Sequence, residues 1–177
     1  MVDHRMDTDE SLSSLRQFAF PRDYQPVPPF TFDVPSDWAT CDAPGCLIAL
    51  REPDKPGTFR ANITVSVDRV ERTLELSDVA AEVLNELERE QPDGELRLEA
   101  EKVVVVAGSP ASLRVQSFKS PELAYRVLQL QVLFFAPDSG CEARQLFTLI
   151  GTCLEDDGDH YIDCFVAAAR SFAFAPS

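Results

Sequence analysis

Apolar and polar residues alternate along several stretches of this chain, and alternation of this kind predicts half-buried β-strands. The clearest example is residues 61–70, whose apolar members share one face of a strand: Ala61, Ile63, Val65 and Val67. The same pattern, bounded by turn-forming residues, predicts further strands at 30–34, 46–53, 96–108, 111–120, 124–137 and 143–155. Gly108 and Pro110 are expected to form the bend between the 96–108 and 111–120 strands.

Two stretches follow the helical period instead. In residues 76–90 apolar positions recur three and four apart and acidic residues line the opposite side, which predicts an amphipathic helix with Ser77 as its N-cap. Residues 160–172 show a second apolar stripe, with Asp159 as the expected N-cap and the acidic run 155–159 as a loop.

The order of these elements predicts an α+β fold. The late strands are joined by tight turns, which only antiparallel pairing allows. We therefore expect a single antiparallel sheet of about six to seven strands with helices packed on it. Residues 30–177 would form this one domain, and residues 1–29 an N-terminal appendage that ends in a proline-rich spacer.

Charge narrows the choice of partners. The chain has 177 residues, of which 30 are acidic and 16 basic, giving a formal net charge of −14. Such a surface repels phosphate backbones and anionic lipids, so nucleic acid is not expected as a partner. The charge is first interpreted as a solvated surface that keeps the protein soluble, and alternatively as an acidic face that steers a basic protein partner. No apolar run is long enough for an integral membrane segment, and the charged N-terminus does not resemble a secretory signal. We therefore expect a cytoplasmic protein.

The pattern offers no catalytic motif and no cofactor or metal site. The five cysteines are an odd number, and the spacing of Cys41 and Cys46 does not match a zinc knuckle. Of the two histidines, His160 is expected at the start of the second helix and His4 lies in the appendage. The acidic run near residue 155 lacks the ligand register of an EF-hand. The sequence thus favours a non-enzyme, with catalysis based on His160 or a cysteine as the minor alternative.

Short structural motifs resemble those of one family. The opening FTFDVPSDW, the hairpin VAGSPASLRVQSF and the ending FVAAARSF resemble PsbP/Mog-type domains, including the LpqN-like and DcrB-like proteins, over residues 30–174. The resemblance implies the α+β fold and, for Trp38, a role as an anchor of the core. Members of that family serve as an accessory subunit, a small-GTPase binder, secretion chaperones and lipoproteins, so the resemblance implies a binding module.

Three functional hypotheses follow. The first is a non-catalytic, adaptor-like or chaperone-like module that binds a protein, basic or with an apolar helix, through a sheet face or edge. The second is a carrier of a small apolar ligand or acyl chain, with a pocket between the sheet and a helix. The third is an uncharacterised enzyme, and a homodimer through an exposed edge strand is open in each case. The expected partner or ligand face comprises Trp38, Val127, Gln129, Gln131, Leu133 and Phe135.

Overall fold

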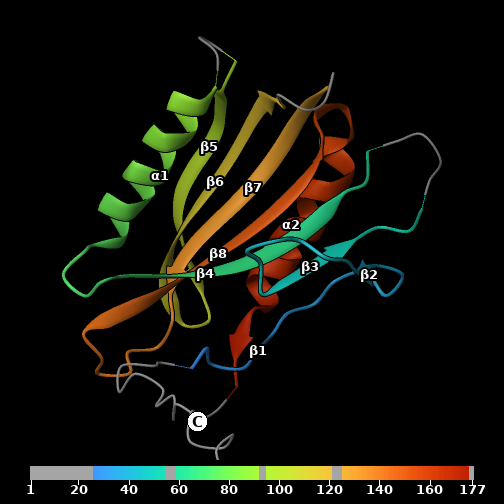
Figure 1. Cartoon of the computed structure of the whole chain (residues 1–177). Helices are drawn as coiled ribbons and strands as arrows, with labels where there is room; N and C mark the ends of the chain where they lie inside the picture. The colour runs from blue at the N-terminus through green and yellow to red at the C-terminus, as the bar shows by residue number, and fades with distance from the viewer. Residues whose placement is uncertain (1–25, 55–58, 92–94, 121–124, 176–177) are drawn as a thin grey trace, which may run out of the picture.

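The computed structural model describes residues 26–54, 59–91, 95–120 and 125–175. Its centre is a seven-stranded, wholly antiparallel sheet in the order β2-β3-β4-β8-β7-β6-β5 (Figure 1). The strands are β2 (Ala39–Thr40), β3 (Ile48–Arg51), β4 (Asn62–Glu71), β5 (Arg97–Val106), β6 (Ser109–Lys119), β7 (Arg126–Phe135) and β8 (Ala143–Leu154). The predicted α+β fold with one antiparallel sheet is confirmed.

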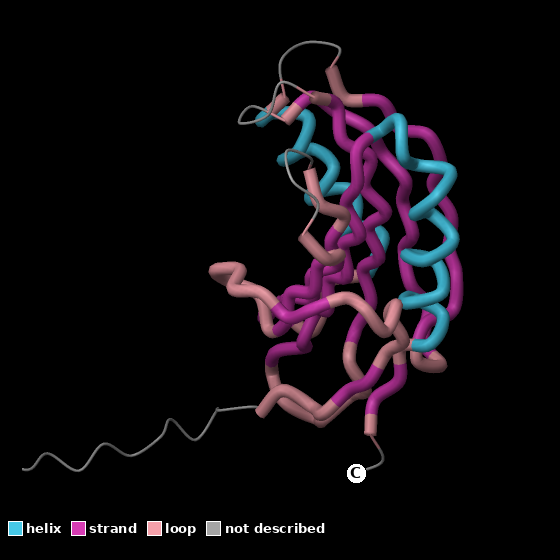
Figure 2. Tube along the Cα trace, turned by 90° about the vertical axis from the view of Figure 1, so that its right-hand side faces the viewer, coloured by secondary structure: helices cyan, strands magenta, loops and turns pink. Residues whose placement is uncertain are grey.

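One helix packs on each face of the sheet, as Figure 2 shows in side view. The first helix, α1 (Leu76–Glu90), has the bounds that the periodicity predicted, and its buried residues Val79 and Ala80 meet Leu133, Phe135 and Leu146 of the sheet. The predicted N-cap is wrong: Glu75 occupies that position and no side chain caps the helix. The polar side of α1 remains in water.

The opposite face carries the main core and the second helix, α2 (Gly158–Ser171). The apolar face predicted for residues 61–70 lies here, with Ile63 and Val65 fully buried. Phe165 of α2 packs directly over Gly151 of β8. The acidic run predicted as a loop instead forms a 3-10 turn, η1 (Glu155–Asp157), and the first turn of α2, so Asp157 rather than Asp159 is the N-cap residue.

A buried carboxylate ties α2 to the edge of the sheet. Glu52, only 6% exposed, accepts hydrogen bonds from the backbone N–H of Ala61 at 3.0 Å and from the Tyr161 hydroxyl at 2.5 Å. A buried charge is tolerated when its oxygens accept hydrogen bonds in this way. Glu52 and Tyr161 are therefore a structural brace between β3, β4 and α2.

The bend of the β5–β6 hairpin differs from the prediction by one position. Val106 pairs with Ser109, so the turn consists of Ala107 and Gly108, which have φ angles of 50° and 77°. Two successive residues with positive φ are the mark of a type I′ turn, which suits the right-handed twist of the flanking strands. Pro110 lies inside β6, opposite Val105.

Candidate functional site

The chain before β2 forms a strap across the end of the main core. Two of its residues make strand β1 (Phe30–Thr31), which pairs antiparallel with β9 (Ala173–Phe174) outside the main sheet. The backbone N–H of Asp33 donates to the Ser171 hydroxyl at 2.8 Å, and Gln145 donates from its side-chain amide to the Pro26 carbonyl at 3.2 Å. The strap, residues 26–35, is thus fixed to α2 and β8 along its length.

Aromatic packing holds the inner side of this strap. Phe30 stacks on Phe172 with ring centroids 5.0 Å apart and meets Phe147 edge-on at 5.6 Å. Phe32 stacks on Phe172 at 5.9 Å. Such ring pairs stabilise beyond the area that they bury. The strap is therefore a rigid wall that exists before any ligand arrives.

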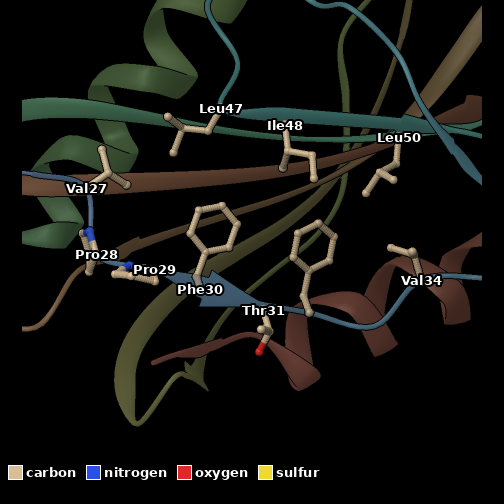
Figure 3. Close-up of a pocket in the computed structure, with 10 residues that line it drawn as sticks. Val27, Pro28, Pro29, Phe30, Thr31, Val34, Leu47, Ile48 and Leu50 are labelled. Carbon is tan, nitrogen blue, oxygen red and sulfur yellow. The ribbon is translucent and has the colours of Figure 1, made fainter. Parts of the chain in front are cut away.

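An apolar groove lies between this strap and β3. Its volume is about 630 Å³. In Figure 3, Ile48 and Leu50 point from β3 toward the strap, Phe30 points from the strap toward β3, and Thr31 points away. None of the ten lining side chains can carry a charge: Val27, Pro28, Pro29, Phe30, Thr31, Phe32, Val34, Leu47, Ile48 and Leu50.

Backbone chemistry explains why this gap stays open. Prolines lack the N–H that a sheet ladder needs, and Pro28, Pro29 and Pro35 flank the only two strap residues that form a strand. On the far side of β3, strand β2 is two residues long and pairs only with Leu50 and Arg51. The groove therefore runs between two extended segments of backbone that are not paired with each other.

Acidic residues predominate in the segment of the chain that supplies the groove's lining, although Arg60 forms an ion pair with the last of them, Asp54. Between positions 26 and 54 the chain carries Asp33, Asp37, Asp42, Glu52 and Asp54 against the single base Arg51. All but Glu52 among these acids are exposed. An apolar groove within an acidic surface favours a ligand that is apolar in its middle and basic at its ends.

Most of the face expected to bind a partner is covered. Val127, Gln131, Leu133 and Phe135 are between 2% and 7% exposed, and Leu133 and Phe135 lie beneath α1. These residues and the half-buried Gln129 do share one face of β7, as the alternation predicted. Because α1 occupies its apolar part, this face offers little surface to a ligand.

The polar members of that face belong to an interior network. Arg114 is 2% exposed and donates to the Ala80 carbonyl of α1 at 3.0 Å, to Glu101 at 2.8 Å and to Gln131 at 3.4 Å. Gln116 donates to Gln129 at 3.4 Å. These bonds join α1 to the sheet rather than forming a binding site.

Trp38 is half-buried in the turn that follows the strap. Its backbone N–H donates to the Pro35 carbonyl at 3.1 Å, and its ring meets that of Tyr161 with centroids 6.4 Å apart. It packs against the main core, as the resemblance implied. Its place beside the strap gives it a structural role, and it does not line the groove.

The groups that catalysis would need are scattered. His160 is exposed on α2, and its ring contacts only that of Tyr161 among the aromatic residues that the structure describes. Burial raises the pKa of the Cys153 thiol from 9.0 to about 12, which keeps it protonated and unreactive. Within the described ranges, no three His, Cys, Asp or Glu side chains gather as metal ligands would, and no helix has the length and apolar character to cross a membrane.

The longest free edge of the sheet is β5. Leu98 is 46%, Val103 78% and Val105 70% exposed, and all three point to the face that carries α1 without being covered by it. The valine run Val103–Val106 is divided between the two faces of the sheet. Only its even members face α2, and Val106 alone is buried. A sheet edge with exposed valines is a second feature that sequence reasoning did not locate.

Comparison with known proteins identifies the fold. No family model and no curated protein sequence matches the chain. Among solved structures, LpqN of Mycobacterium tuberculosis, involved in cell envelope biogenesis, superimposes with a TM-score of 0.67 at 15% identity, covering 85% of each chain. The fold is therefore PsbP/LpqN-like, as the sequence motifs indicated.

Two further structures have the same fold. PA94 of Pseudomonas aeruginosa, a protein of unknown function, gives a TM-score of 0.58 at 16% identity over 89% of this chain and 90% of that one. The cyanobacterial PsbP, CyanoP, of Synechocystis sp. PCC 6803 gives 0.55 at 16% identity over 82% and 86%. None of the three is described as an enzyme, and at such identities the likeness concerns the fold alone.

Proposed function

We propose that this chain is a non-catalytic protein-binding module that holds an extended, apolar segment of a partner in the groove between the strap and β3. The observation that carries the proposal is the groove itself, about 630 Å³ in volume and lined by ten side chains without an ionisable group. An exposed apolar depression of this kind is typical of binding surfaces.

The shape of the groove favours a polypeptide. Its walls are two extended segments, the strap and β3, whose backbones already pair with β9 and with β2 and β4, so an extended segment between them meets their apolar side chains. The strap is already held by Phe172, Ser171 and the pairing with β9, so little ordering is needed when a ligand binds. The acidic surroundings favour basic residues at the ends of the bound segment.

A carrier of a small apolar ligand is the second candidate, because the volume of the groove falls within the range usual for small-molecule sites. A depression between the sheet and α2, one of the two helices beside which this hypothesis allows a pocket, measures only about 230 Å³. A single fatty acid such as palmitate would therefore have to lie in the same groove, exposed along its open side.

Peptide selection tests the proposal. A random peptide library is selected on the full chain, and the affinity of the recovered peptides is then measured by fluorescence anisotropy for Leu47→Asp and for Leu74→Asp. The two leucines are 44% and 38% exposed, and only Leu47 lines the groove. We expect peptides with apolar centres and basic ends, an affinity loss of about tenfold or more for Leu47→Asp, and no change for Leu74→Asp.

Other outcomes would count against a peptide site. Equal affinities of the two variants would place the binding elsewhere. Palmitate binding that is abolished by Leu47→Asp, without any selected peptide, would support the small-ligand candidate instead. Circular dichroism of both variants shows whether the fold is retained, which the exposure of both leucines leads us to expect.

A further inference from the structure

Strand β5 is exposed along one outer edge of the sheet. It has ten residues and forms one outer edge of the seven-stranded sheet, with β6 as its neighbour. Natural proteins protect such edges with charges, prolines or bulges, because unpaired backbone groups there recruit other strands. In β5 the protection is confined to its first half: a register shift between Leu98 and Ala100 and the charges up to Lys102.

The second half of β5 is unprotected. Val103 and Val105 are 78% and 70% exposed, and no charged residue lies between Val103 and Gly108. The whole strand is also neutral within a strongly acidic chain, because Arg97 and Lys102 balance Glu99 and Glu101. Two copies can therefore approach at this edge with less repulsion than the net charge of −14 would suggest.

The hairpin turn determines which backbone groups are free. In a two-residue type I′ hairpin the flanking pair, here Val106 and Ser109, exchanges hydrogen bonds, and the next pair does not. The residue opposite Val105 is Pro110, which has no N–H to offer. The N–H and C=O groups of Val105 and Val103 therefore point outward, from the same residues that expose their side chains.

We propose that β5 pairs antiparallel with β5 of a second copy of this chain, about a two-fold axis at Val104. Two residues that lie opposite each other in an antiparallel pair point to the same side of the sheet, and along one strand such residues are an even number of positions apart. The two-fold axis, which lies midway between them, therefore passes beside a residue and not between two residues. An axis at Glu101 or Lys102 would set like charges directly opposite each other. An axis at Val103 would set Val105 against Glu101, which is already bound to Arg114.

The axis at Val104 avoids each of these conflicts. Val103 then lies opposite Val105 of the second copy and Val105 opposite Val103, with about four backbone hydrogen bonds between the two strands. Four exposed valine side chains become one apolar row on the face that carries α1. The seven-stranded sheets of the two copies would then form one continuous sheet across the two β5 strands. This site is independent of the groove, which lies at the opposite end of the strand order.

Sedimentation velocity of the full chain over a concentration range of about 1–200 µM tests the pairing. An interface of about four backbone hydrogen bonds and four valine side chains is small, so we expect weak, concentration-dependent association. We expect the mass to rise from that of the 19.7 kDa monomer to twice that value. Val105→Pro removes an outward N–H and spares the bonds to β6, and V103K/V105K sets like charges across the axis. Both changes should weaken association about tenfold or more.

The control lies on the same strand. Leu98→Lys changes a side chain that is 46% exposed but lies outside the paired segment 101–107, and it should leave the dimer intact. A wild-type chain that stays monomeric throughout the range would overturn the proposal. So would a dimer that survives both β5 variants, or an assembly that grows beyond two copies, since a two-fold pairing closes on itself.

Discussion

Gly151 of β8 lies directly beneath the Phe165 ring of α2. A Cβ built on it would overlap the ring of Phe165, which is itself fully buried. The glycine thus allows an aromatic side chain to lie flat against the backbone of a central strand. Gly158, the next glycine along the chain, differs in this respect. A Cβ built on it would lie 2.9 Å from the end of the flexible Leu128 side chain.

Gly151→Ala should therefore lower the free energy of unfolding by about 2–3 kcal/mol, because neither the strand nor the Phe165 ring has room to move. Gly158→Ala is the control and should change it by less than about 1 kcal/mol, since Leu128 can rotate and alanine suits a helix. Urea unfolding followed by the fluorescence of Trp38 measures both. Equal effects would show that the contact with Phe165 is not what requires glycine.

Among the elements, α1 depends on one buried side chain as well as on its apolar stripe. Val79 and Ala80 supply the apolar contact, while Arg114 reaches from β6 to the Ala80 carbonyl and to Glu101. Removing this guanidinium would leave buried acceptors on both α1 and β7 without their donor. Helix α1 is thus attached to the sheet by a buried hydrogen bond from Arg114 within an otherwise apolar contact.

Arg114→Ala should destabilise the protein by about 3 kcal/mol and loosen α1 before α2. Glu101→Gln removes only the charge of a side chain that is 46% exposed, and should cost about 1 kcal/mol or less. Hydrogen exchange of the α1 and α2 amides distinguishes local from global loosening. If Arg114→Ala accelerated exchange equally in both helices, the specific link to α1 would be disproved.

The elements also show what the pattern alone could predict. Helix α1 was placed to the residue because its apolar period is long and bounded by turn residues. The N-cap of α1 and the hairpin turn were misplaced because residue preferences alone do not fix them. Helix α1 starts after Glu75 without a side-chain cap although Ser77 is the better capping residue, and the bend uses Ala107 and Gly108 although Pro110 also favours a turn. The exposure of Val103 and Val105 could not be predicted, because an unbroken apolar run does not tell an outer strand from a central one.

At the scale of the whole molecule, the motifs near Phe30 and Gly108 predicted the fold, and comparison with LpqN and CyanoP confirmed it. The groove was not predicted. It arises where β3 and the strap, whose strand β1 lies outside the seven-stranded sheet, lie side by side without pairing, and no local pattern records such an approach. Sequence reasoning chose the face of β7 instead, which α1 covers.

We propose that the groove between the strap and β3 holds an apolar, basic-ended segment of a partner. Backbone NMR of the ¹⁵N-labelled chain, titrated with a peptide selected as described above, tests it most directly. We predict saturable shifts of the amides of Val27, residues 30–34 and residues 47–50, and binding that weakens as salt is added. Shifts confined to β5 or to the surface of α1, with the groove unaffected, would contradict the account.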